Sequence, residues 1–238
     1  RAAGFESFDA LWDSTLARLR AEADRELAAL AGEPLTPLER LTEPSHLYFG
    51  PTISPDGRWL VVTRDNPYQE NALLRFELDG DRVSAPQVLE ARSTGYQAGF
   101  SRSGRFLVFD EARWAGGHTL TSEVKILDLK DMRIAGASYG LRARDADVHP
   151  DGKRIVSVAN HGGANRLVWT DTAFENAVVA LDGVGFRRLS GPRISPDGES
   201  VVLSAHDGSR GGEDLLLVSS GGAKVLLADG HRNLAPSW

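Results

Sequence analysis

The sequence predicts an all-β protein: a β-propeller of four-stranded blades, preceded by an amphipathic α-helix. The first observation is a Ser-Pro-Asp-Gly turn signal at residues 54–57 and 195–198, which recurs in weaker form at residues 101–104 and 149–152. The second is the period, because the glycines that end these four turns are 47, 48 and 46 residues apart, a spacing typical of repeat architectures. The third is the strand content, since four β-rich runs per unit of about 45 residues is the pattern of a propeller blade.

Each turn is followed by a run of apolar and β-branched residues that reads as a strand. Proline sets φ at the second turn position, and glycine accepts the left-handed conformation that reverses the chain. The repeats extend over residues 46–91, 92–141, 142–182 and 183–230. After them, residues 233–238 resemble the inner strand of a fifth blade, so we expect an incomplete ring.

The first 45 residues are expected to form a helix and a linker. Phe5 to Ala31 carries apolar residues at steps of three and four, Ser7 is a candidate N-cap, and Gly32 precedes a proline-rich stretch. The apolar stripe is expected to pack on the side of the propeller or on a preceding domain, and a free amphipathic arm is the alternative. In the linker, residues 38–42 resemble the last strand of a blade, so we expect them to close the ring from the N-terminal side.

Composition narrows the functional classes. The formal net charge is −6, which does not favour nucleic acid or an anionic membrane surface as a partner. The chain has no cysteine, so disulfides and thiolate chemistry are excluded. No apolar run approaches the roughly 18 residues that a membrane span needs. The chain begins with Arg1 and not with methionine, which suggests a processed product or an excised piece.

The repeat itself resembles a known one. The stretch from Gly50 to Val62, with its later Asp79-Gly80 turn, and the stretch from Gly191 to Val202, with Gly221-Gly222, are similar to the TolB-like propeller repeat of bacterial envelope proteins. This resemblance implies an extracytoplasmic location, whether periplasmic, outer-membrane-associated or secreted, and a protein or peptide partner. Residues 4–31 resemble the closing helix that follows gluzincin-type zinc metallopeptidase domains, which would imply a peptidase domain upstream.

Catalytic motifs are not found in the sequence. It contains no His-Glu-x-x-His for zinc, no Gly-x-Ser-x-Gly nucleophile elbow and no nucleotide-binding glycine loop. The acidic residues Asp56, Asp151 and Asp197 are explained by turn chemistry. We therefore predict no catalytic residue, no cofactor and no resident metal.

The candidate site is the face opposite the Pro-Asp-Gly turns, where the connections between second and third strands emerge. These loops are expected at residues 65–71, 111–121, 160–165 and 206–214, and loops on a rigid scaffold commonly carry binding residues. The candidate ligand-binding residues are Tyr68, Glu70, Trp114, His118, Asn160, His161, His206 and Asp207. Links between blades add Arg144, Asp145, His231 and Arg232. A metal shared by His161 and His206 is a further alternative.

Three functional hypotheses follow from these observations. The first is a non-catalytic recognition or scaffold module that binds a protein or peptide. The second is an accessory propeller that admits substrate to a zinc metallopeptidase domain outside this sequence. The third is a structural half-propeller that assembles with a complementary chain.

Overall fold

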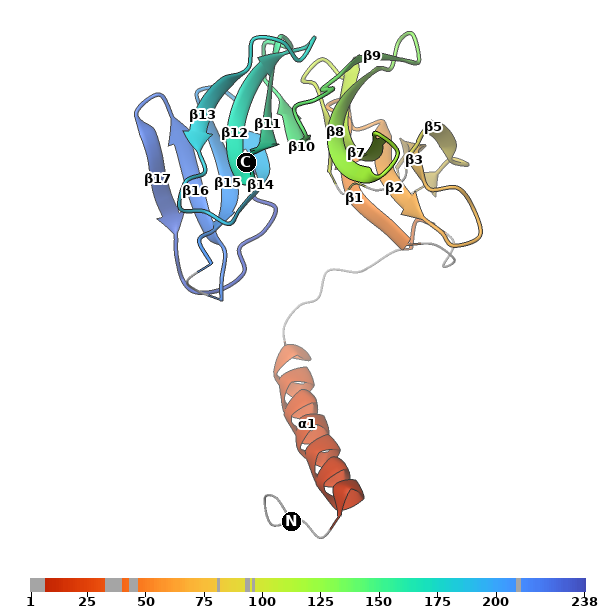
Figure 1. Ribbon diagram of the computed structural model, residues 1–238. Coiled ribbons are helices and arrows are strands. Elements are labelled where there is room, and N and C mark those ends of the chain that lie inside the picture. Colours follow the sequence, from red (N-terminus) through yellow and green to blue (C-terminus); the bar gives the residue numbers. More distant parts are fainter. Residues whose placement is uncertain are drawn as a thin grey trace. The chain divides into compact units, whose positions relative to one another are not determined.

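The computed structural model describes residues 7–32, 40–42, 47–80, 82–92, 95, 97–208 and 211–238. The chain divides into two compact units, Arg1–Arg40 and Leu41–Trp238. The first contains one helix and the second contains the strands (Figure 1).

The helix α1 spans Phe8–Leu30, three residues shorter at its start than the predicted helix. Ser7 is the N-cap as predicted, and its Oγ accepts a hydrogen bond from the amide of Ala10 at 3.1 Å. Most of its apolar residues are exposed, with Phe8 at 75% and Leu27 at 64%, while Leu11 and Leu16 are half-buried. What the apolar stripe packs against stays a prediction.

The second unit contains the four predicted blades. Blade 1 consists of β1 (Leu47–Ile53), β2 (Trp59–Asp65), β3 (Ala72–Asp79) and β5 (Gln87–Ala91), with a short β4 (Arg82–Val83) beside the end of β3. Blade 2 consists of β6 (Ala98–Phe100), β7 (Phe106–Ala115), β8 (Thr119–Asp128) and β9 (Arg133–Ala137). Blade 3 consists of β10 (Ala143–Val148), β11 (Arg154–His161), β12 (Ala164–Asp171) and β13 (Val178–Asp182). Blade 4 consists of β14 (Arg188–Ile194), β15 (Ser200–His206), β16 (Asp214–Ser219) and β17 (Gly222–Leu227).

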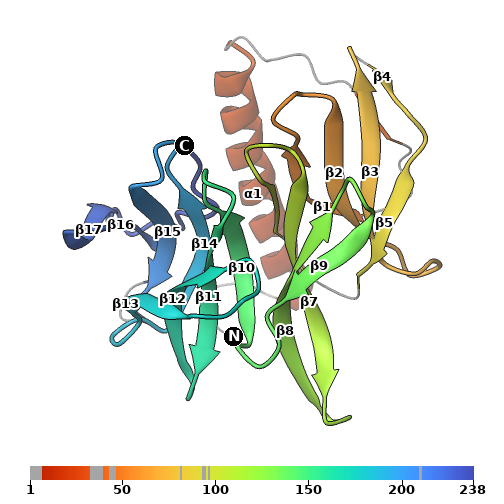
Figure 2. The same ribbon diagram turned by 90° about the horizontal axis from the view of Figure 1, so that it is seen from above.

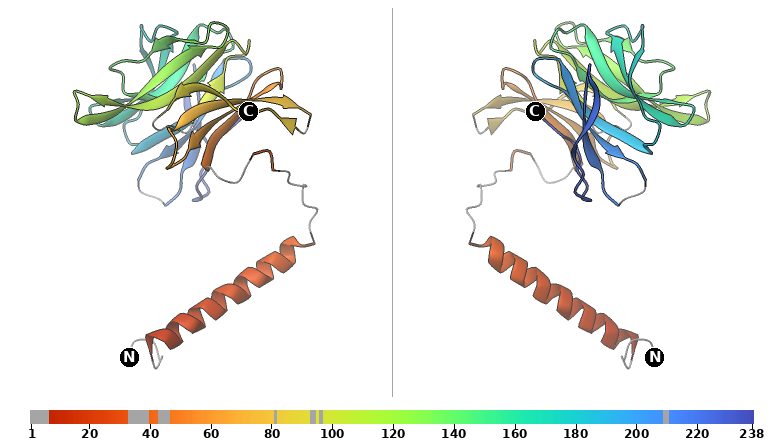
Figure 3. Two further views of the ribbon diagram at one scale, coloured as in Figure 1. Left: turned by 90° about the vertical axis from the view of Figure 1, so that its right-hand side faces the viewer. Right: turned by 90° about the vertical axis from the view of Figure 1, so that its left-hand side faces the viewer.

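Each blade is an antiparallel up-and-down sheet, and the sheets stand side by side in chain order (Figures 2 and 3). The first strand of each blade contacts the first strand of the next, from β1 to β6 to β10 to β14. The hydrophobic core lies largely between the blades. One cluster joins Val156 and Leu167 of blade 3 to Leu189 and Leu203 of blade 4, and equivalent clusters join the other neighbouring blades.

Two predicted loops are mostly strand. Residues 111–121 form a long hairpin in which β7 runs to Ala115 and β8 begins at Thr119. In the shortened loop of blade 3, only Gly162 and Gly163 separate the paired residues His161 and Ala164. Both glycines have positive φ, 61° and 83°, which matches the tight two-residue turns of β-hairpins. The polar sequence of these stretches therefore reflects exposed strands.

Neither of the two predicted terminal strands is a strand among the described residues. In the linker, residues 38 and 39 lie outside the described residues, and residues 40–42 are not in a strand. At the C-terminus, residues 233–238 run beside β14 without a continuous ladder. There the indole Nε1 of Trp238 donates to the carbonyl of Arg193 at 2.9 Å, and Ala235 has a φ of 49°, close to the 60° of Gly191 in the equivalent bend of β14.

Candidate functional site

The antiparallel topology places two kinds of connection at opposite ends of the blades. We call the end that carries the β1–β2, β6–β7, β10–β11 and β14–β15 turns the turn face. We call the end that carries the connections between second and third strands the loop face. The predicted site residues all belong to the loop face, at or beside the ends of β2, β7, β11 and β15.

Exposed aromatic rings are the most distinctive feature of the loop face. Tyr68 is 93% exposed, and Trp114 is 64% exposed opposite its cross-strand partner Leu120. Tyr139, in the link between β9 and β10, is 65% exposed, and the guanidinium of Arg113 lies 4.9 Å from its ring centre. Sequence reasoning missed Tyr139 because it considered mainly the connections within blades, and the signal that could have found it is Gly140, which follows it in a turn with a φ of 86°. Solvent-exposed Tyr and Trp side chains are well suited to binding proteins and peptides.

The polar residues predicted for the loop face have mixed roles. The ring Nδ1 of His206 lies 2.9 Å from the carbonyl of Gly212, so this imidazole braces its own loop. His118, His161, Glu70 and Asp207 are exposed, and Asn160 is half-buried. His161 and His206 end the second strands of adjacent blades, but no hydrogen bond joins them among the described residues. Within the described part of the chain, no three His, Asp or Glu side chains gather in a way that could hold a metal ion.

A chain of buried polar contacts connects the blades beneath these loops. Arg92, in the link between blades 1 and 2, is fully buried and pairs with Asp110 of β7, with 2.5 Å between nitrogen and oxygen. The other carboxylate oxygen of Asp110 accepts from the amide of Asp145 in β10 at 3.2 Å. Asp145 in turn accepts from the amide of Gly191 in β14 at 3.4 Å. We call these contacts the inter-blade ladder, because they run from blade 1 to blade 4.

The ladder changes the interpretation of two predicted link residues. Arg144 donates to the carbonyl of Leu189 at 2.8 Å and pairs with Asp145, so both residues hold blade 3 against blade 4. Burial raises the pKa of Asp145, and burial likewise raises the pKa of Asp147, which accepts from the amide of Ile194 at 2.9 Å. These carboxylates are structural groups in contact with backbone amides.

The Pro-Asp-Gly turns confirm the structural interpretation of their aspartates. In the first turn, Ser54 Oγ donates to Asp56 Oδ1 at 2.5 Å and accepts from the amide of Trp59 at 2.9 Å. The hydrogen bond from Ser54 lowers the pKa of Asp56, and the fourth turn repeats the arrangement with Ser195 and Asp197. In the third turn, burial raises the pKa of Asp151, but hydrogen bonds that include those from Lys153 and Arg154 lower it to about 2.

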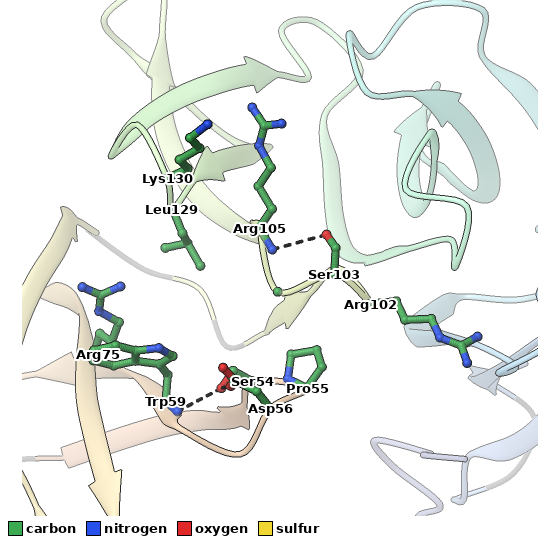
Figure 4. A pocket seen from close by; sticks show the side chains of 11 residues that line it. Ser54, Pro55, Asp56, Trp59, Arg75, Arg102, Ser103, Arg105, Leu129 and Lys130 are labelled. Carbon is green, nitrogen blue, oxygen red and sulfur yellow. Dashed lines mark hydrogen bonds between the residues drawn. The ribbon is translucent and has the colours of Figure 1, made fainter.

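A groove between blades 1 and 2 opens on the turn face (Figure 4). It encloses a cavity of about 620 Å³, and four of its eleven lining residues are Arg or Lys while one is acidic. We call it the cationic groove; it is lined by Ser54, Pro55, Asp56, Trp59, Arg75, Arg102, Ser103, Gly104, Arg105, Leu129 and Lys130. Sequence reasoning missed this site because its basic residues come from three separate segments of the chain.

No helix in the described part of the chain is long and apolar enough to cross a membrane.

Comparisons with known proteins establish the fold. No protein-family model and no curated protein matches the sequence. Among solved structures, the chain is similar to a protein of Agrobacterium tumefaciens assigned as TolB, with a TM-score of 0.68 and 19% identity over 83% of this chain and 71% of that one. It is also similar to TolB from Acinetobacter baumannii, with a TM-score of 0.58 and 18% identity over 76% of this chain and 43% of that one. A structure from a study of two prolyl endopeptidases matches with a TM-score of 0.55 and 13% identity over 78% of this chain and 30% of that one. At these identities, the likeness shows a TolB-like β-propeller fold.

Proposed function

We propose that this chain is a non-catalytic recognition module of an extracytoplasmic bacterial protein, which binds a protein or peptide through its loop face. The observation that carries the proposal is the exposure of Tyr68 and Trp114 on hairpins held by a rigid scaffold. Side chains of this kind offer a large contact area at little entropic cost, and they dominate the energetics of many interfaces. The likeness to TolB structures supports the fold and the location that the proposal assumes.

The binding residues of the loop face are Tyr68, Glu70, Trp114, His118, Asn160, His161, His206 and Asp207, and we add Tyr139. In this proposal the exposed rings form the centre of the contact, and the histidines, Asn160 and the acids form its polar rim. His206 keeps its loop in shape through Gly212 and contributes indirectly.

A second candidate function is an accessory propeller that controls access to a peptidase. It is favoured by one observation, the likeness to a prolyl endopeptidase structure of which this chain covers 30%. In that case the catalytic residues belong to a domain outside this sequence, as the resemblance of residues 4–31 to a metallopeptidase closing helix also suggests. The structural half-propeller remains a third proposal, which a mass measurement in solution tests.

The loop-face proposal is tested with peptides selected from a random library for binding to the purified chain. We expect Trp114→Ala/His161→Ala to weaken binding at least about tenfold, because a central aromatic anchor contributes about 2 kcal/mol or more. The melting temperature should not change, since both side chains are exposed. The matched control is Val178→Ala/Val225→Ala, two exposed residues on outer strands, which should bind normally. Unchanged binding by the Trp114 variant would refute the proposal.

A further inference from the structure

The charge of the cationic groove contrasts with that of the whole chain. The protein carries a formal charge of −6, but this groove is lined by four cationic residues and one acidic residue. The equivalent groove between blades 3 and 4 is lined by one cation and one acid, Arg154 and Glu199. The positive charge of the cationic groove is therefore not a feature that every repeat carries.

In the part of the chain that the structure describes, one of the four cations pairs directly with a carboxylate. Arg105 donates through Nε and Nη2 to Asp128, with a closest distance of 2.7 Å. Among the described residues, no carboxylate oxygen lies within 4.0 Å of a charged nitrogen of Arg75, Arg102 or Lys130. The partners that Arg102 and Arg75 do have are neutral: the carbonyl of Pro196 at 3.2 Å and the side chain of Gln87.

Arg75 is held in place by the aromatic ring beneath it. Its guanidinium carbon lies 4.1 Å from the ring centre of Trp59, a cation–π contact across adjacent strands. Its Nε is buried and has no hydrogen-bond partner among the described residues. The protein thus fixes a guanidinium at the groove without a carboxylate of the described residues in direct contact. Burial lowers the pKa of Arg75, although the more distant charge of Glu77 on the same strand raises it in part.

The arrangement of these charges indicates the ligand. The basic groups point apart instead of meeting at one point, and that of Arg102 extends from the rim toward Pro196 in the turn of blade 4 (Figure 4), which fits an extended ligand with several separate negative groups. Several backbone amides of the groove are already used within its walls, because Gly104 donates to the Ser101 carbonyl at 2.8 Å, Trp59 to Ser54 Oγ at 2.9 Å and Lys130 to Asp128 Oδ1 at 2.9 Å. Carboxylates match guanidinium groups through paired hydrogen bonds, and Pro55 and Leu129 add apolar surface.

We infer that the cationic groove binds an acidic peptide segment of a partner protein. The carboxylates of that peptide pair with the side chains of Arg75, Arg102 and Lys130. The site lies at the end of the blades opposite the loop face, so it is a second binding site beyond the proposed function. A volume of about 620 Å³ lies within the range of small-ligand sites and accommodates a short peptide stretch.

The test uses the whole purified chain and a fluorescein-labelled peptide in which glutamates alternate with glycines, titrated by fluorescence anisotropy. Arg102→Gln/Lys130→Gln removes two exposed charges from the groove, and we expect binding to weaken about tenfold or more. Lys153→Gln/Lys224→Gln removes two exposed charges elsewhere and should weaken binding less than about twofold, through long-range electrostatics alone. The same peptide with glutamine in place of glutamate should not bind.

Three results would overturn the inference: no saturable binding, equal weakening in both double variants, or equal binding of the glutamine peptide. Competition by inorganic phosphate would also count against the inference if phosphate displaced the peptide at concentrations near the dissociation constant of phosphate itself. The groove would then be a small-anion site. Melting temperatures of all variants confirm that they are folded. The Trp114→Ala/His161→Ala variant should bind the acidic peptide normally, so failure at one face is distinguishable from failure at the other.

Discussion

The inter-blade ladder predicts that Asp110→Asn is one of the most damaging single-atom changes available in this protein. The Arg92 side chain is fully buried and that of Asp110 is 9% exposed. Arg92 also donates to the carbonyls of Asp110 and Gln97, at 2.8 and 3.0 Å, and to Thr63 Oγ1. Substitution by asparagine keeps an oxygen acceptor but removes the negative charge, so the buried guanidinium loses its hydrogen-bonded counter-ion and keeps only the weaker influence of Glu111.

The expected magnitude follows from the burial of this pair. Removing one partner of a buried ion pair typically costs about 3–5 kcal/mol, and the retained acceptor places Asp110→Asn near the lower limit, at about 3 kcal/mol. For a domain of this size, each kcal/mol shifts the melting temperature by roughly 2–4 °C, so we expect a fall of about 6–12 °C.

The assay is urea unfolding followed by circular dichroism, with Glu77→Gln as the matched control. Glu77 pairs with Arg58 at 3.1 Å, but these side chains are 47% and 62% exposed, so the control should lose less than about 0.5 kcal/mol. The double variant Arg92→Met/Asp110→Asn should lose less than the sum of its single variants, because no buried charge remains. A loss in Asp110→Asn as small as that of Glu77→Gln would refute the reasoning.

Two further predictions concern backbone space and pH. Gly95→Ala should destabilise the fold by roughly 2 kcal/mol or more in thermal unfolding, because a Cβ there would lie 2.4 Å from Arg92 Nη2 and from the Asp110 carbonyl oxygen. The control is Gly117→Ala, where φ is also positive but the space around the Cβ is open, and it should cost only about 1 kcal/mol. Equal losses would contradict this. The pKa of Asp151 is about 2 in the fold and about 3.9 when unfolded, so its stabilisation is present above about pH 4 and lost as pH falls toward about 2. In Asp151→Asn, the urea midpoint should therefore fall less between about pH 5 and about pH 2.5 than in the parent chain, and an identical fall would contradict the role given to Asp151.

The blade architecture was predictable from the sequence because its determinants are local. A Pro-Asp-Gly turn and the β-rich run after it lie within a dozen residues, and both repeat with a regular period. The second repeat kept its turn despite Arg102 and Ser103, since the amide of Gly104 donates to the Ser101 carbonyl at 2.8 Å and Ser103 Oγ takes the place of the aspartate, 3.2 Å from Ser101 Oγ. The same reasoning overestimated loop lengths, because polar residues on exposed strands resemble loop residues in a single sequence.

The candidate sites were less predictable because they join distant residues. Arg92 and Asp110 are 18 positions apart and meet only after blade 2 folds beside the link. The basic residues of the cationic groove come from β3, the β6–β7 turn and the β8–β9 turn, and no local motif connects Arg75 with Lys130. The loop-face aromatics were more predictable, since Trp114 stands near the Gly116-Gly117 turn and Tyr139 stands directly before Gly140, which also has a positive φ.

The grooves between blades show how one repeat can acquire different specificities. In blade 1, Trp59 begins the second strand and Arg75 of the third strand stacks on its ring. In blade 3 the residue types are exchanged: Arg154 begins the second strand, and its guanidinium carbon lies 5.4 Å from the ring centre of Trp169 in the third strand. The two positions are diagonal neighbours in both sheets, because Val61 pairs with Arg75 and Val156 pairs with Trp169. Either strand can therefore carry the arginine, with the tryptophan on the other. Exchanging the two residues moves the positive charge by one strand and leaves the hairpin unchanged. Redesign of these grooves can proceed one blade at a time, with the neighbouring repeats left intact.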